Sequence, residues 1–185
     1  MRSLFLSAAV AIAATAASSP AGAGLVTIGN STARDCYEAA VARSADRNSF
    51  NHCDIALDQE ALSRKDKAAT LVNRGALYLR GHHYRSAVRD FDAALKADSN
   101  NAEAWLNLAI VRLQQGGSSE AMPMIEKSLA LNTMRQALAY YSRAIANERM
   151  GRVRAAYDDL QRAHSLAPEW REPTEDLKRY QVRRR

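Results

Sequence analysis

The stretch GHHYRSAVRDFD, residues 81–92, sets the register of the chain, because its alanine, Ala87, recurs as Ala121 and Ala156 at spacings of 34 and 35 residues. A small residue stands twelve positions before each alanine, and a large apolar residue stands four positions after it: Gly75, Ala109 and Ala144, then Phe91, Ile125 and Leu160. Small residues let two helices cross closely, and a large residue one turn later fills the space beside them. The register therefore predicts repeated helix pairs.

The rest of the chain favours the same fold class. From about Arg34 onward, apolar residues recur three and four apart, and short Gly, Ser and Asn segments interrupt them. We find no long alternating run of the kind that predicts a strand. A single helix pair cannot bury its apolar face alone, so such pairs must stack on one another. We expect an all-α fold, an α-solenoid of antiparallel helix pairs.

These units resemble tetratricopeptide repeats, a family of 34-residue helix–turn–helix modules. The matching residues are Gly75, Tyr78, Ala87, Phe91 and Ala94 in residues 68–101; Trp105, Leu108, Ala109, Ala121 and Ile125 in 102–136; and Tyr140, Ala144, Ala156, Leu160, Ala163 and Pro168 in 137–170. The departures are Leu71, Arg74 and Ser99, then Thr133, then Arg143 and Asn147. The resemblance implies three repeats over 68–170, a degenerate helical repeat over 34–67, and a C-terminal capping helix with a basic tail over 171–185.

The first residues are typical of a secretory signal peptide. Arg2 is followed by an apolar run from Leu4 to Ala17, and Ala21 to Ala23 supply small residues at a cleavage position. A membrane anchor is the alternative, but the run is shorter than the roughly 20 residues of a spanning helix. We expect a signal peptide over 1–23, a flexible leader over 24–33, and an exported protein, periplasmic or extracellular, with no membrane span after cleavage.

Two cysteines, Cys36 and Cys53, are the only ones in the chain. A chain in an oxidising compartment usually pairs its cysteines, and the alternative is two buried thiols. In the repeat frame, Cys36 takes the place of Leu108 and Cys53 that of Phe91. The resemblance implies that these positions face each other, so a disulfide would connect the two helices of an end repeat.

Candidate chemistry centres on His82 and His83, which the repeat frame places in a turn. Two metal ligands on one helix face need a spacing of about four residues, which these histidines lack. Asp90 and Asp92, and likewise the pair Asp158–Asp159, are interpreted as residues of exposed helix faces. No nucleophile motif stands in a suitable context. We expect no metal, no cofactor and no catalytic residue, and hence a protein that is not an enzyme.

The resemblance also implies a partner-binding groove on the first helix of each repeat. Its lining would be Val72, Asn73, Ala76, Leu79, Arg80, Leu106, Asn107, Ile110, Leu113, Gln114, Tyr141, Ser142, Ile145 and Arg149. Apolar residues there would receive side chains of the partner, and Arg80 and Arg149 would bind a carboxylate. The alternative is that the apolar residues pack against a neighbouring repeat or the capping helix.

Two functions follow from these features. The first is an exported adaptor that binds a peptide or a helix of another protein in the groove; we expect no nucleic-acid partner. The second draws on the net charge of +6 and on the basic C-terminus with Arg183 to Arg185, which could bind an anionic lipid surface or another polyanion. The sequence names neither the partner nor the oligomeric state.

Overall fold

The computed structural model describes residues 31–180, so the expected signal peptide, most of the leader and the last five residues lie outside the described part. Within residues 31–180 the chain forms nine helices and no strand. They are α1 (Thr32–Val41), α2 (Arg47–Gln59), α3 (Arg64–Arg80), α4 (Tyr84–Ala97), α5 (Ala102–Gln114), α6 (Ser118–Ala130), α7 (Gln136–Arg149), α8 (Val153–Leu166) and α9 (Arg171–Lys178). None of these helices is long and apolar enough to cross a membrane.

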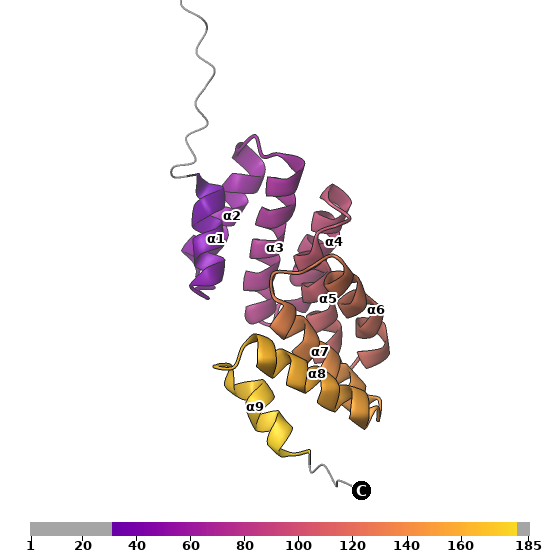
Figure 1. Ribbon diagram of the computed structural model, residues 1–185. Coiled ribbons are helices and arrows are strands. Elements are labelled where there is room, and N and C mark those ends of the chain that lie inside the picture. The colour runs from indigo at the N-terminus through magenta and orange to yellow at the C-terminus, as the bar shows by residue number, and fades with distance from the viewer. Residues whose placement is uncertain (1–30, 181–185) are drawn as a thin grey trace, which may run out of the picture.

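The helices stack in chain order from α1 to α9 (Figure 1). Each consecutive pair packs as a helical hairpin, and the first helices of successive pairs, α1, α3, α5 and α7, also contact one another. The prediction of an all-α repeat fold is confirmed. The last helix, α9, packs on α8 and ends the stack.

Side-chain caps explain where several helices begin. The oxygens of Ser31, Asp46, Ser63 and Asn101 accept hydrogen bonds from backbone N–H groups three residues later, at the starts of α1, α2, α3 and α5. Each of these residues replaces one of the backbone acceptors that the first turn of a helix lacks.

The helix crossing within the first full repeat depends on Gly75. A Cβ at Gly75 would lie 2.5 Å from Cε1 of Phe91, which is fully buried. At the equivalent place in the next repeat, Ala109 has a Cβ and packs in one cluster with the smaller Ile125. Where the first helix has the smaller residue, glycine, the second helix has the larger one, phenylalanine; where the first has alanine, the second has isoleucine.

The turns within the repeats share one backbone geometry. His82, Gly116 and Gly151 have φ angles of 59°, 84° and 73°. In each turn the next backbone N–H donates to a carbonyl oxygen five residues earlier, as His83 N does to Tyr78 O at 2.9 Å. This pattern is the Schellman ending of a helix, in which glycine is the favoured residue. Histidine therefore occupies a position where its two counterparts are glycine.

The 35-residue spacing arises in one loop. Residues 131–135 separate α6 from α7, whereas only 98–101 separate α4 from α5. The Glu103 carboxylate holds the longer loop: its Oε1 accepts from Thr133 Oγ1 at 2.5 Å and from Met134 N at 2.9 Å, and its Oε2 accepts from Arg135 Nε at 2.5 Å.

Two aspartates correct the sequence interpretation. Asp90 and Asp159, expected on exposed faces, are each only 6% exposed. Each accepts hydrogen bonds from an arginine of the same repeat, Arg74 or Arg143, which satisfies the buried carboxylate. Asp92 and Asp158 are exposed, as expected.

The N-terminal pair holds the two cysteines. Cys36 of α1 and Cys53 of α2 are fully buried, and their sulfur atoms lie at bonding distance, 2.05 Å. Both pack against Leu77 of α3. The bond therefore joins the two end helices next to their contact with the first repeat.

Candidate partner-binding face

Two rows of equivalent side chains run across the first helices of the three repeats. Ala76, Ile110 and Ile145 are half-buried, while Arg80, Gln114 and Arg149, one turn later, are exposed. We call these six residues the first-helix strip. Because the members of each row occupy the same register position on α3, α5 and α7, their similar exposure follows from the repeat geometry.

Five other residues of the expected groove are buried: Val72, Leu106, Asn107, Leu113 and Ser142. Leu106 and Leu113 pack in the cluster that contains Ala139 of α7, and Val72 packs with residues of α4 and α5. Neighbouring repeats cover these side chains, so the expectation that Val72 and Leu106 receive a partner's side chains is corrected. Asn73, Leu79 and Tyr141 remain half-buried.

The two asparagines at equivalent positions differ in their surroundings. Asn107 Oδ1 accepts from Arg135 Nη2 at 3.1 Å, and its buried Nδ2 has no hydrogen-bond partner among the described residues. Asn73 is half-buried. Arg135 therefore hydrogen-bonds the oxygen of the Asn107 amide, and of the two asparagines only Asn73 is partly exposed.

The strip carries positive charge. Arg80 forms no ion pair within the described part of the chain, and burial together with the nearby charge of Arg43 lowers its pKa. Arg149 donates through Nη1 to the backbone oxygen of Leu113 at 2.5 Å, and no carboxylate of residues 31–180 pairs with it. Both guanidinium groups are therefore available to an anionic partner.

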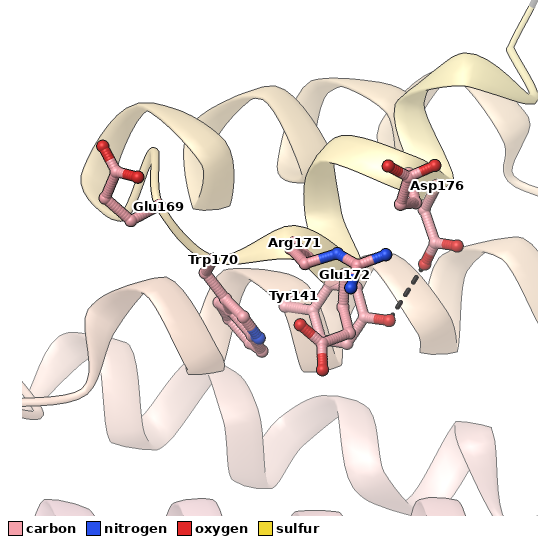
Figure 2. Close-up of a pocket in the computed structure, with 7 residues that line it drawn as sticks. Tyr141, Glu169, Trp170, Arg171, Glu172 and Asp176 are labelled. Carbon is pink, nitrogen blue, oxygen red and sulfur yellow. Dashed lines mark hydrogen bonds between the residues drawn. The ribbon is translucent and has the colours of Figure 1, made fainter.

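Tyr141 contacts the capping helix, as Figure 2 shows. Its ring lies 4.8 Å from that of Trp170 at an angle of 63°, and its hydroxyl donates to Asp176 Oδ2 at 2.9 Å. Burial, then the hydrogen bond to Asp176, raises the pKa of Tyr141 to about 12. A hollow of about 510 Å³ adjoins the two rings, and Glu169, Glu172 and Glu175 line it with Arg171. For Tyr141, packing against the capping helix is the arrangement observed.

The two turn histidines lie at the surface. His82 and His83 are exposed, and His82 Nδ1 lies 2.9 Å from the Tyr84 hydroxyl. Among residues 31–180, no group of three or more His, Cys, Asp and Glu side chains is placed to hold a metal ion.

Sequence reasoning missed the contacts of Glu103 and Arg135. Together they hold the loop before α7 and cover Asn107. The signal was present as the one extra residue in the 35-residue spacing, which marks this loop as different from its counterpart.

A comparison with protein families matches residues 91–122, from α4 to α6, to the tetratricopeptide repeat. The human protein O-mannosyl-transferase TMTC3 is 30% identical over 111 residues, which cover 60% of this chain and 12% of that protein. The human Superkiller complex protein 3 is 30% identical over 90 residues, covering 43% of this chain and 6% of its own length. The chain therefore matches only a small part of each relative.

Solved structures share the fold at low sequence identity. The first TPR domain of Spaghetti (RPAP3), bound to the HSP90 peptide SRMEEVD, has 24% identity and a TM-score of 0.57, covering 62% of this chain and 90% of that chain. MamA from Desulfovibrio magneticus RS-1, from residue 41 to its end, has 20% identity and a TM-score of 0.61, covering 80% and 82%. Both likenesses support a solenoid of tetratricopeptide-type helix pairs.

Proposed function

We propose that this tetratricopeptide-repeat protein is an interaction module that binds a peptide or a helix of a partner protein along the first-helix strip. The observation that carries the proposal is the repetition of exposure: one half-buried row and one exposed row continue across three successive helices. Such a regular surface suits a partner that is itself extended or helical.

The chemistry of the strip indicates the partner's character. Ala76, Ile110 and Ile145 form an apolar row for apolar side chains of the partner. Arg80 and Arg149 bind carboxylates, and the Gln114 amide both donates and accepts. The partner segment therefore combines apolar residues with acidic ones. The peptide bound to the similar Spaghetti domain, SRMEEVD, has this composition, which supports the proposal.

The proposal includes a location outside the cytosol. The signal-peptide pattern before residue 24 supports it, and so does the Cys36–Cys53 bond, because disulfides persist in oxidising compartments. The partner would accordingly be another exported or envelope protein. We assign the module no catalytic role of its own.

Capture from envelope extract tests the strip. We expect wild type to recover a defined set of proteins, and an Ile110→Arg, Ile145→Arg variant to lose them, because each charge would enter the apolar row. The matched control is Val153→Arg, Leu166→Arg, which adds the same charges to exposed apolar residues of α8. Recovery of the same proteins by both variants would rule out the strip as the binding site.

The alternative function, binding of the basic C-terminus to anionic surfaces, receives less support from the described residues. Lys178 pairs with Glu175 at 2.8 Å, and Arg179 pairs with Asp176 at 3.1 Å and Glu148 at 3.3 Å. Carboxylates therefore compensate the charges of Lys178 and Arg179, which leaves Arg183 to Arg185 of the basic C-terminus for that function. Strip binding with apolar anchors should persist at high salt, whereas binding through the tail should not.

A further inference from the structure

A second hollow lies between α4 and the C-terminal end of α5, and none of its residues belongs to the first-helix strip. It has a volume of about 630 Å³, and three arginines line it: Arg85 and Arg89 from α4 and Arg112 from α5. Among the residues that the structure describes, no carboxylate lines it. Cavities lined by one sign of charge concentrate the opposite charge.

The three guanidinium groups are uncompensated. Within residues 31–180 none of them has a carboxylate within 4.0 Å; Arg89 donates to Ser86 Oγ at 3.1 Å and Arg112 to Gln115 Oε1 at 3.3 Å, both neutral acceptors. By contrast, Arg74 and Arg143 each bind an aspartate. Like charges so placed repel one another, so an anion entering the hollow relieves that repulsion.

The Glu120 carboxylate, which feels the charge of Arg112, engages other groups. Glu120 accepts from Ser119 Oγ at 2.8 Å, and its pKa is lowered first by that hydrogen bond and only in smaller part by the charge of Arg112. Glu120 does not line the hollow. The charge of Arg112 therefore affects Glu120, but Glu120 forms no ion pair with the arginines of the hollow.

Two further features of α4 define the ligand. The helix begins at Tyr84 with no side-chain cap and no acidic residue in its first turn, so its partial positive charge adds to that of the arginines. The half-buried side chains of Tyr84 and Val88 pack on the cluster of Ala87 and Phe91 and give the hollow an apolar floor. The hollow thus combines cations with an apolar contact.

We propose that this hollow is a second docking surface, which binds an acidic segment of a partner protein. Carboxylates of the segment bind Arg85, Arg89 and Arg112, and an apolar side chain between them rests on Tyr84 and Val88. The proposal goes beyond the function of the first-helix strip, because it uses a second helix of a repeat and different residues. Failure of either site leaves the other intact.

The test is calorimetric titration of the full chain with the acetylated, amidated peptide EELEE. We expect the triple variant Arg85→Gln, Arg89→Gln, Arg112→Gln to bind it roughly tenfold more weakly, since each exposed ion pair contributes modestly. The matched control removes the same charge from exposed residues elsewhere, as Arg47→Gln, Lys65→Gln, Lys67→Gln. The control should bind the peptide as wild type does, and so should the strip variant Ile110→Arg, Ile145→Arg.

A charge-reversed pair guards against a loss through misfolding. The variant Arg85→Glu, Arg89→Glu should gain binding of the peptide KKLKK, and wild type should not bind this peptide. Equal weakening of EELEE in the triple variant and its control would overturn the proposal. The proposal would also be overturned if the triple substitution weakened only the binding of inorganic phosphate, or only that of phosphatidylserine vesicles, and not that of EELEE. The ligand would then be a small oxyanion or a membrane.

Discussion

Arg74 forms a bidentate ion pair with Asp90: its Nε and Nη2 donate to the two carboxylate oxygens at 2.8 Å each. Arg143 and Asp159 repeat the arrangement at 2.9 and 2.6 Å, with the same separation of 16 residues. Both arginines stand where the tetratricopeptide-repeat pattern, which these units resemble, has leucine. Hydrogen bonding to Asp90 raises the pKa of Arg74 further above its usual range. Two of the three repeats therefore hold their helices together with an ion pair in place of an apolar contact.

The middle repeat indicates how the pair can be replaced, because Leu108 and Met124 occupy the equivalent positions. We expect Arg74→Leu alone to lower the free energy of unfolding by about 2–3 kcal/mol, since it leaves Asp90 buried without a cation. The double variant Arg74→Leu, Asp90→Met should lie within about 1 kcal/mol of wild type. Urea unfolding followed by circular dichroism measures both.

The same substitutions in the third repeat form the control. Arg143→Leu should destabilise by a similar amount. Arg143→Leu, Asp159→Met should recover less stability than its counterpart, because the buried Asn147 Nδ2 donates to Asp159 Oδ2 at 3.0 Å and would lose its acceptor. A double variant less stable than either single variant would contradict the account. It would mean that the ion pair is needed for a geometry that leucine and methionine cannot reproduce.

The fold was predictable from the sequence because residues of the same type recur at the packing positions of each repeat. Alanine stands at the position of Ala87 in all three repeats, and a large apolar residue stands at the position of Phe91. Such a recurrence can be read from the sequence alone. The burial of Asp90 was not predicted, because a carboxylate on a helix suggests exposure unless its partner is known, and Arg74 lies 16 residues away. The recurrence of the same Arg and Asp in a second repeat was the signal that pointed to it.

The binding face was predictable only in part, for a related reason. The register indicates which side of a first helix faces away from its own partner helix. It does not indicate how closely the next repeat approaches, and α7 of the next repeat packs against Leu106 and buries it, while Ile110 and Ile145 keep some exposure. The contact of Tyr141 with α9 depends on where the last helix packs, which no repeat elsewhere in the chain reveals.

His82 offers a stabilising substitution. Its φ of 59° lies in the left-handed region, where glycine has no steric penalty, and Gly116 and Gly151 occupy the same turn position. We expect His82→Gly to raise the free energy of unfolding by about 0.5 kcal/mol, after the greater flexibility of glycine in the unfolded chain is counted. Gly116→His should shift it in the opposite direction. Thermal unfolding of both variants tests the assignment, and a stabilising Gly116→His would contradict it.

Tyr141 should give a pH-dependent contribution to stability. Its pKa rises from 10.0 to about 12 on folding, through burial and then the hydrogen bond to Asp176. The contribution is therefore fully present below pH 10 and is lost as the pH rises from 10 to about 12. Tyr141→Phe should cost about 1 kcal/mol at neutral pH and remove this loss. Urea unfolding from pH 8 upward compares it with Tyr37→Phe, an exposed control that should retain the wild-type profile.

Reduction of the Cys36–Cys53 bond should destabilise the N-terminal pair. The cysteines are 17 residues apart, for which the chain-entropy account gives about 3 kcal/mol. Because α1 has no repeat before it among the described residues, we expect the loss to be local. Hydrogen exchange after reduction should accelerate in α1 and α2 and remain slow in α5 and α7. Equal acceleration throughout would show instead that the stack unfolds as one unit.

Glu103 should keep the loop that follows α6 in a fixed conformation. Its carboxylate accepts three hydrogen bonds from Thr133, Met134 and Arg135, and the last is an ion pair. Glu103→Gln removes the charge and places an N–H₂ group where one oxygen accepts, so we expect a loss of about 1–2 kcal/mol. Faster exchange of the backbone N–H of Met134, which donates to that carboxylate, is the direct measurement. The exposed Glu120→Gln should leave it unchanged. An unaltered exchange rate in Glu103→Gln would mean that packing of α6 against α7 alone fixes the loop.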